Sequence, residues 1–216
     1  MRLKGAIFDL DGVIVSSVSL HFNSWKKMFT EYGKEFSFED YKEKVDGIPR
    51  MSGARAILTD LSEGELEKAA AKKQGYFLEF LEKEGIEVYE STLKLIKVLK
   101  QNALKVAVIS SSKNCLPVLK KVGIDNLFEV IITGHDIKKG KPDPQVFLTA
   151  SQRLGLIPQE CIVFEDAVLG VEAAKRGNFK CVGIDRYHNP SRLAKADSVV
   201  NDASEITLEK LRELTK

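Results

Sequence analysis

Cysteine is scarce in this chain. Only three cysteines occur among its 216 residues, Cys115, Cys161 and Cys181, and they lie far apart with no Cys-x-x-Cys pair. An odd number of widely spaced cysteines argues against a disulfide framework and against a zinc site built on the usual ligand spacing. We therefore expect all three side chains to be buried and to act as small hydrophobic groups.

A large excess of one charge is also missing. The 33 basic residues nearly balance the 31 acidic ones, which gives a formal net charge of +2. So small a charge produces no global field that would attract nucleic acid or a membrane surface. The partner that we expect is a small molecule, with no nucleic acid and no membrane, and we expect the protein to be a monomer.

Long hydrophobic runs are absent as well. No stretch reaches the roughly eighteen consecutive apolar residues of a membrane span. The first apolar segment begins at Gly5, and nothing ahead of it resembles a signal peptide. We therefore expect a cytoplasmic protein.

The chain does contain the material of an ordinary globular protein, with 44% hydrophobic and 30% charged residues. Short apolar runs alternate with amphipathic stretches, which is typical of a parallel sheet covered by helices on both faces. The predicted fold class is α/β, with a doubly wound parallel-sheet, Rossmann-like core. Strands are predicted at 5–9, 105–110, 129–133, 161–166, 181–185 and 198–200, and helices at 113–122, 144–154 and 167–176. For helix 144–154, Asp143 is the expected N-cap, Pro144 the first helical residue and Gly155 the stop.

One long stretch interrupts the alternation. Between the first two predicted strands lie roughly ninety residues without a clear strand, far more than one crossover helix requires. We predict that residues 17–87 form a small inserted helical-bundle cap domain, and that 1–16 and 88–216 form the core domain. The first cap helix stops near Gly33 and carries an apolar stripe made of Phe22, Trp25, Met28, Phe29 and Tyr32. Ser37 and Ser62 are predicted to start later helices, Ser62 as part of a capping box.

Two aspartates follow the first predicted strand, in the segment FDLDGVIV at residues 8–15. Asp9 and Asp11 are two positions apart, so on an extended chain both carboxylates point the same way. Gly12 then suits a tight exit from the strand. Two converging carboxylates at the rim of an apolar core repel each other and are costly to desolvate. The pair therefore requires a metal ion, a proton or a lysine.

Polar residues also follow other predicted strands. The second strand is followed by Ser110, Ser111, Ser112 and Lys113, the loop after the third contains Lys141, and the fourth ends in Glu165 and Asp166. Ligands of open α/β sheets bind beyond the carboxyl ends of the strands, so we expect these side chains to share one crevice. Each motif alone is equally compatible with a turn, a helix cap or a surface loop. Their joint occurrence at successive strand ends favours a functional site.

These residue types suit phosphoryl transfer. Mg²⁺ prefers hard oxygen ligands, which Asp9, Asp166 and Glu165 could supply. Serine hydroxyls and free backbone N–H groups at a helix start can hold a phosphate, and Lys141 would neutralise charge on the transferring group. An aspartate in such a site can attack phosphorus, while a neighbouring carboxyl group protonates the leaving oxygen.

The segments FDLDGVIV, VISSSKN, GKPDP and VFEDAVLGVEAAK resemble, in order and spacing, the four signature motifs of the haloacid dehalogenase superfamily. The resemblance spans nearly the whole chain. It implies a doubly wound core, a helical cap inserted after the first strand, Mg²⁺ as cofactor and an aspartyl-phosphate intermediate. By position it implies that Asp9 is the nucleophile and that Asp11 is the acid/base, whose backbone carbonyl also binds the metal. The implied phosphate-binding hydroxyl, neutralising lysine and metal acids are Ser110, Lys141, and Glu165 with Asp166.

Within the superfamily, the chain resembles the β-phosphoglucomutase subgroup, on the cap segments LHFNSWK and GIPR and on SSSKN. The substrate-binding residues that this resemblance implies are His21, Trp25, Gly47, Arg50, Lys73, Ser111, Ser112, Lys113 and Asn114. A mutase must hold a second phosphate that does not react, and the Arg50 guanidinium can grip it bidentately. His21 is expected to position Asp11, with an ordinary core or surface histidine as the alternative. Lys73 is expected to face the substrate, with a solvated helix face as the alternative.

The resemblance therefore implies Mg²⁺-dependent phosphoryl transfer that interconverts β-glucose 1-phosphate and glucose 6-phosphate through a bound bisphosphate. The alternative is a phosphatase of a small sugar phosphate, in which water takes the phosphoryl group from Asp9. A non-catalytic phosphosugar-binding regulator on the same fold would be expected to lose Asp9, Asp11 or Lys141, and all three are present.

Overall fold

The computed structural model describes residues 2–216. These residues divide into two compact units. The core unit comprises the residues up to Val15 together with Val88–Lys216, and the cap unit is Ser16–Glu87. The predicted cap, 17–87, differs from this compact unit by one residue.

The core unit contains one six-stranded parallel sheet in the order β3-β2-β1-β4-β5-β6. Its strands are β1 (Gly5–Asp9), β2 (Lys105–Ile109), β3 (Val130–Ile132), β4 (Cys161–Glu165), β5 (Lys180–Ile184) and β6 (Ser198–Val200). The strands form where the sequence has short apolar runs, and every residue of β1 and β4 is buried. The expectation of a doubly wound parallel sheet is confirmed.

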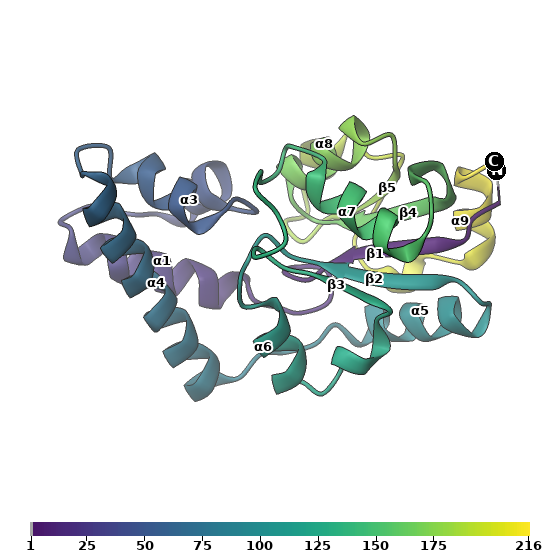
Figure 1. The fold of residues 1–216 in the computed structure, drawn as a ribbon, viewed down its shortest axis with the longest axis horizontal. Coiled ribbons are helices and arrows are strands. Elements are labelled where there is room, and N and C mark those ends of the chain that lie inside the picture. Colours follow the sequence, from purple (N-terminus) through teal and green to yellow (C-terminus); the bar gives the residue numbers. More distant parts are fainter. Residues whose placement is uncertain (1) are drawn as a thin grey trace. The chain divides into compact units, whose positions relative to one another are not determined.

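Helices cover both faces of this sheet. They are α5 (Glu90–Gln101), α6 (Cys115–Lys121), α7 (Gln145–Leu154), α8 (Val168–Arg176) and α9 (Leu208–Leu214), with short 3₁₀ turns at Asp125–Leu127, Pro158–Glu160, Pro190–Leu193 and Ala203–Glu205. Figure 1 shows α7 and α8 above the strands of the core unit and α5 and α6 below them. The three cysteines are buried and unbonded to one another, as predicted.

The start of α7 differs slightly from the prediction. Pro144 is the N-cap and Gln145 the first helical residue, so the expected N-cap at Asp143 is wrong by one position. Asp143 still contributes, because its Oδ1 accepts a hydrogen bond from the Gln145 N–H at 3.0 Å. Gly155 ends the helix as predicted, with φ +71° in the left-handed region that favours glycine.

The cap unit consists of helices. They are α1 (Val18–Glu31), α2 (Phe38–Asp40), a π-helical turn (Tyr41–Val45), α3 (Arg50–Ile57) and α4 (Glu63–Glu84). The predicted aromatic stripe of α1 packs into a buried cluster with residues of α3 and α4, and Trp25, Met28 and Phe29 are its most buried members. Ser37 and Ser62 both form capping boxes, which start α2 and α4.

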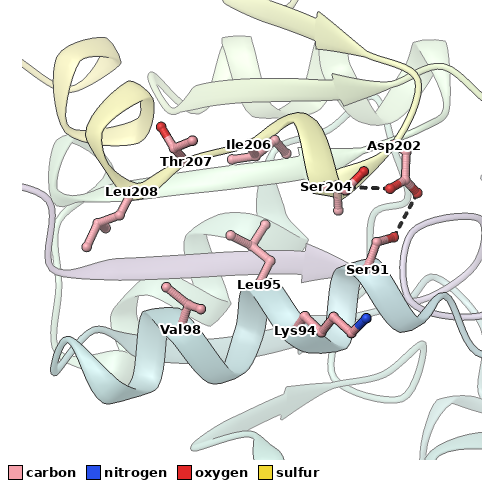
Figure 2. Close-up of a pocket in the computed structure, with 10 residues that line it drawn as sticks. Ser91, Lys94, Leu95, Val98, Asp202, Ser204, Ile206, Thr207 and Leu208 are labelled. Atoms are coloured by element: carbon pink, nitrogen blue, oxygen red, sulfur yellow. Dashed lines mark hydrogen bonds between the residues drawn. The ribbon is translucent and has the colours of Figure 1, made fainter.

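A pocket of about 530 Å³ lies between α5 and the segment that leads into α9 (Figure 2). Leu95 and Val98 of α5 face Ile206 and Leu208 across it. None of the sequence-predicted site residues lines this pocket. Among the helices of residues 2–216, none is long and apolar enough to span a membrane.

Candidate active site

Asp9 ends the central strand β1 and is buried at the carboxyl edge of the sheet. The three residues before it, Ala6, Ile7 and Phe8, are fully buried, because β1 runs between β2 and β4. This packing fixes the backbone that leads to Asp9, so the carboxylate comes from a rigid element. The strand order also reverses here, which is where open α/β sheets bind their ligands.

Lys141 supplies a positive charge beside this carboxylate. It lies in the loop after β3, and only 2% of its side chain is exposed. Its Nζ lies 2.7 Å from Asp9 Oδ1 and also donates to Glu165 Oε1. Burial by itself would lower the pKa of Lys141, but the two carboxylates raise that pKa well above its ordinary value. The ammonium therefore stays charged and bridges the ends of β1 and β4.

Three carboxylates converge at this point. Asp9, Glu165 and Asp166 each offer an oxygen, these oxygens lie within 4.8 Å of one another, and all three residues are buried. Two glycines make the arrangement possible. A Cβ on Gly12 would lie 1.9 Å from Asp166 Oδ2, and a Cβ on Gly170 would lie 1.9 Å from Glu165 Oε1. The backbone is thus packed directly against both carboxylates.

The donor set of this cluster fits a hard divalent cation. Three carboxylates against the single ammonium of Lys141 leave an excess of two negative charges when all are ionised. Burial raises the pKa of the Asp9 carboxyl well above its usual range; Lys141 opposes the rise, and the charges of Glu165 and Asp11 add to it. A bound cation would remove this penalty, and oxygen-only ligands are those that Mg²⁺ prefers.

Asp11 lies on the tight turn that follows β1. The next residue, Gly12, takes φ +79°, a conformation that favours glycine. Ser110, buried at the end of β2, donates a hydrogen bond from Oγ to Asp11 Oδ2 at 2.9 Å and accepts one from the Ser112 N–H at 3.0 Å. The ends of β1 and β2 therefore bring Asp9, Asp11 and Ser110 together, as the strand-end argument predicted.

The rest of the SSSKN segment forms a turn and not a helix start. Ser111 and Ser112 are half-buried, Lys113 is exposed and Asn114 is buried. The predicted start of the helix at residue 113 is wrong by two residues, since α6 begins at Cys115. The Asn114 N–H donates to Ser112 Oγ at 3.1 Å, and this hydrogen bond from backbone to side chain stabilises a turn before the helix. The substrate-binding roles of these four residues stay predictions.

The cap unit holds Arg50 at the start of α3. Its Nη1 donates to Gln74 Oε1 on α4. Burial lowers the pKa of the Arg50 guanidinium from its ordinary value. Gly47 takes φ +73° in the turn ahead of α3, so a side chain there would be strained. The contact of either residue with a substrate stays a prediction.

Lys73 is buried, with 3% of its surface exposed, so the alternative of a solvated helix face is wrong. Its Nζ lies 2.8 Å from His21 Nδ1 and 5.0 Å from the centre of the Phe77 ring. The His21 ring stacks on the same phenylalanine at 4.4 Å. An ammonium group has only donors, so with Lys73 charged the neutral imidazole keeps its hydrogen at Nε2. The expected roles of His21 and Lys73 toward Asp11 and substrate stay predictions.

Trp25 packs inside the cap unit. It is 3% exposed, and its ring stacks on Phe29 with the centroids 5.2 Å apart. Gly53 lies directly against the indole, since a Cβ there would be 2.8 Å from Trp25 Cζ2. The structure gives this tryptophan a packing role, and its contact with substrate stays a prediction.

The fold and the cluster together define a class. An open parallel α/β core with buried carboxylates and a lysine at the switch point, and a helical unit inserted after β1, is the architecture of a phosphoryl-transfer enzyme. Residues 6–184 match the haloacid dehalogenase-like hydrolase family, so the chain belongs to that family.

Individual relatives include both mutases and phosphatases. The chain is 32% identical to a β-phosphoglucomutase of Mycobacterium bovis, over 95% of this chain and 92% of that one. It is 29% identical to hexitol phosphatase A of Escherichia coli, over 97% of this chain and 96% of that one. A crystal structure of a β-phosphoglucomutase from Clostridium difficile superimposes with a TM-score of 0.91 at 29% identity, covering 99% of this chain and 97% of that one. The protein is therefore an enzyme of the haloacid dehalogenase type, in a group of phosphatases and phosphomutases.

Residues near the site were also missed by the sequence analysis. Asp185 and Arg186 follow β5 at the same edge of the sheet, one strand beyond the strand ends at which the site was predicted. The side chain of Arg186 reaches the turn after β1, where it contacts the Gly12 carbonyl. The close approach of Gly170 to Glu165 left no signal in a single sequence.

Proposed function

We propose that the protein transfers a phosphoryl group from a small phosphorylated sugar through a phosphorylated Asp9. The observation that carries this proposal is the buried contact of 2.7 Å between Lys141 Nζ and Asp9 Oδ1 within a cluster of three carboxylates. The lysine keeps one oxygen of Asp9 paired while the other can attack phosphorus. It also offsets the negative charge that would otherwise repel the incoming phosphate.

The metal ligands in this proposal are the side chains of Asp9, Glu165 and Asp166 and the backbone carbonyl of Asp11. When bound there, Mg²⁺ would neutralise charge on the phosphoryl oxygens and hold them in place. The glycines at 12 and 170 support the assignment, because their missing side chains allow the carboxylates of Asp166 and Glu165 to sit against the backbone.

Asp11 is the proposed acid and base. As Asp9 forms its bond to phosphorus, the bond to the departing sugar oxygen breaks and that oxygen takes a proton from Asp11. In the second half, an acceptor hydroxyl returns a proton to Asp11 as its oxygen attacks phosphorus and frees Asp9. Ser110 donates to Asp11 Oδ2 at 2.9 Å and so helps to hold in place the carboxyl group that exchanges this proton.

The finer proposal is that the acceptor is a sugar hydroxyl, so that β-glucose 1-phosphate and glucose 6-phosphate interconvert through a bisphosphate. The relative from Mycobacterium bovis at 32% identity supports it. Arg50 supports it too, because its half-buried guanidinium, oriented by Gln74, suits a second, non-reacting phosphate. A monomeric, cytoplasmic enzyme is part of the same proposal.

A phosphatase is the second candidate, with water as the acceptor. The relative from Escherichia coli, named a hexitol phosphatase and covering nearly the same length, favours it. Both candidates need the same core residues, so the acceptor alone separates them.

The test incubates the purified protein with Mg²⁺, β-glucose 1-phosphate and a trace of glucose 1,6-bisphosphate, and follows glucose 6-phosphate and inorganic phosphate together. Glucose 6-phosphate forming far faster than phosphate is released supports the mutase, whereas phosphate release alone supports the phosphatase. Asp9→Asn should abolish both activities, and turnover by that variant would refute the aspartyl-phosphate mechanism.

A further inference from the structure

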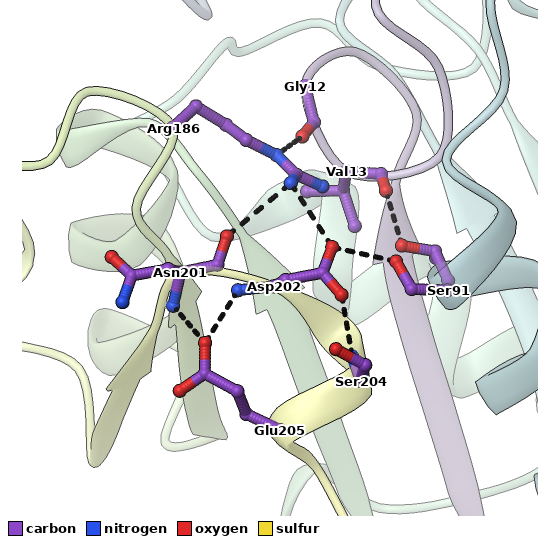
Figure 3. A network of polar contacts seen from close by, with 9 residues as sticks. Gly12, Val13, Ser91, Arg186, Asn201, Asp202, Ser204 and Glu205 are labelled. Atoms are coloured by element: carbon purple, nitrogen blue, oxygen red, sulfur yellow. Dashed lines mark hydrogen bonds and ion pairs between the residues drawn. The ribbon is translucent and has the colours of Figure 1, made fainter.

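Arg186 lies two residues beyond the end of β5 and turns its side chain toward the loop that follows β1 (Figure 3). Its Nε–H donates to the Gly12 carbonyl oxygen at 2.7 Å. Its guanidinium lies 3.6 Å from the centre of the Tyr89 ring. Only 13% of the side chain is exposed, so these contacts form largely away from solvent.

The far end of the guanidinium is held by the segment after β6. Arg186 Nη1 lies 3.5 Å from the Asn201 carbonyl oxygen and 3.7 Å from Asp202 Oδ2. Asp202 is itself fixed, because its carboxylate accepts from Ser91 Oγ at 2.7 Å and from the Ser204 N–H at 2.9 Å. Figure 3 shows these contacts as one connected network, so the position of the arginine is determined from both ends.

The loop after β1 receives three such contacts in succession. The carbonyl of Gly12 accepts from Arg186, that of Val13 from Thr92 Oγ1 at 2.8 Å, and that of Ile14 from the Tyr89 N–H at 2.9 Å. Thr92 and Tyr89 belong to the start of α5, whereas Arg186 belongs to the segment that follows β5. Arg186 also contacts the Tyr89 ring, so it links the first of these anchors to the last.

The anchored carbonyl of Gly12 belongs to the residue directly after Asp11. Gly12 takes φ +79°, in the region that favours glycine, and backbone hydrogen bonds within residues 10–15 close the turn around it. The hydrogen bond from the buried, charged Arg186 to the Gly12 carbonyl comes from outside this turn and adds a contact that fixes the peptide after Gly12. The orientation of the Asp11 side chain depends on the same backbone.

We propose that Arg186 is a positioning residue, which fixes the peptide after Gly12 and so aligns the carboxyl group of Asp11 with the departing oxygen. The inference rests on the proposed function, because it assumes that Asp11 is the acid. Arg186 contacts no reacting atom in this proposal and acts through the loop. Its loss should therefore affect substrates in proportion to how much they need the acid.

Two phosphate esters with different leaving groups test this dependence. The glucose oxygen that leaves from β-glucose 1-phosphate must be protonated, because an alkoxide is a poor leaving group. Nitrophenolate is a weak base and leaves p-nitrophenyl phosphate without a proton. For Arg186→Met at saturating Mg²⁺, kcat/KM for phosphoryl transfer from β-glucose 1-phosphate should fall about 10- to 100-fold, part of the roughly 10²- to 10⁴-fold that a positioned acid supplies. The value for p-nitrophenyl phosphate should fall no more than about threefold by the same reasoning. Arg186→Lys keeps a hydrogen-bond donor but loses the planar group that stacks on Tyr89, so its kcat/KM for β-glucose 1-phosphate should lie between those of the unaltered enzyme and Arg186→Met.

The matched control is Arg192→Met. Arg192 also stacks its guanidinium on a tyrosine, 4.3 Å from the Tyr187 ring centre, and lies in the 3₁₀ turn after β5. Among residues 2–216, no hydrogen bond or ion pair joins it to the loop after β1. This variant should leave both substrates unchanged. Equal losses on both substrates in Arg186→Met would make the arginine merely structural, and no loss on either would remove it from the mechanism.

Asp11→Asn separates failure of the inference from failure of the proposed function. It should show the same preference as Arg186→Met, but more strongly. If Asp11→Asn affects both substrates alike, or if the unaltered enzyme turns over neither ester, the proposed function fails and the inference fails with it. If Asp11→Asn is selective and Arg186→Met is not, only the inference fails.

Hydrogen exchange gives a second readout that needs no activity. The Gly12 N–H donates to the Val15 carbonyl at 2.9 Å within the loop. In Arg186→Met this amide should exchange at least about tenfold faster, whereas amides of β1 should be unchanged. Unaltered exchange across residues 10–15 would overturn the proposal even if the variant were too unstable for kinetics.

Discussion

Replacing Gly170 by alanine should displace Glu165, one of the proposed metal ligands. A methyl group at this position would lie 1.9 Å from Glu165 Oε1 and 2.0 Å from its Cδ, far inside van der Waals contact. Glu165 has no room to yield, because it is 0% exposed, accepts from the Ala167 N–H at 2.9 Å and contacts Lys141. Overpacking of this kind destabilises by about 1–3 kcal/mol, which for a chain of this size lowers Tm by roughly 2–12 °C.

Gly75→Ala is the matched control. Gly75 also lies inside a helix, α4, but a Cβ there would meet nothing within 4 Å. Alanine at such a site should stabilise by about 0.5–1 kcal/mol, since it restricts the unfolded chain without a clash. The two variants therefore shift Tm in opposite directions, although both are glycine-to-alanine changes in helices.

Thermal unfolding in a chelator measures the stability of each variant, and calorimetric titration with Mg²⁺ measures binding. Because displaced Glu165 is a proposed ligand, Gly170→Ala should weaken Mg²⁺ binding about 10- to 100-fold, the usual effect of disturbing the support of a ligand. Gly75→Ala should bind as tightly as the unaltered protein. A Gly170→Ala variant at least as stable as the parent, with unchanged binding, would refute the packing argument.

Three further predictions concern charge and burial. Lys141→Met should destabilise the metal-free protein by about 3–5 kcal/mol in urea denaturation, because it leaves buried carboxylates without their counter-charge; an unchanged midpoint would contradict this role. All three cysteines should resist a thiol reagent at pH 8 until the protein is unfolded, because each is buried and burial raises the pKa of each thiol, that of Cys161 to about 12; rapid labelling of the folded protein would count against it. Partial burial opposes ionisation of Asp202, but hydrogen bonds from Ser204 and Ser91 and the charge of Arg186 lower its pKa to about 2. Because the pKa of Asp202 is lower in the folded protein, its ionised carboxylate stabilises the fold above the ordinary pKa, and this stabilisation is lost as the pH falls through the folded-state pKa. In Asp202→Asn the free energy of unfolding should therefore depend less on pH between about pH 4 and 2. An identical acid unfolding profile would exclude that contribution.

The sheet and the polar residues at its strand ends were predictable because their signals are local. β1 and β4 are buried on both faces, so their sequences are almost purely apolar, and an aspartate or glutamate at the end of such a run is conspicuous. Parallel strands bring these ends to one edge whatever the length of the connections. Asp9, Ser110 and Glu165 could therefore be placed near one another without knowledge of any contact.

The failures have the opposite cause. A solvated helix face was the alternative for Lys73 because its neighbours in sequence are small or polar, yet the side chain is buried by Phe77, one turn away, and by His21 of another helix. Its long aliphatic stem and the two aromatic faces compensate for burial of the amine. A sequence pattern does not show this compensation, because it depends on a residue from another helix. The start of α6 was misplaced because a side chain, that of Ser112, closes a turn where the pattern predicted helix.

Arg186 shows why a site with a clear motif can still depend on a contact that the sequence does not reveal. It is separated from Gly12 by 174 residues, and its partner is a carbonyl oxygen, which every residue carries and no motif records. The motif FDLDG thus supplies the carboxylates of Asp9 and Asp11, while the loop that follows them is contacted by Arg186, beyond the end of β5, and by Thr92 of α5. A relative can therefore retain every motif residue and still differ in how firmly the acid is held. In the proposed mechanism both candidate acceptors, water and a sugar hydroxyl, give their proton to Asp11. Substitutions in this anchor should therefore alter the rates of both reactions without changing which reaction the enzyme catalyses.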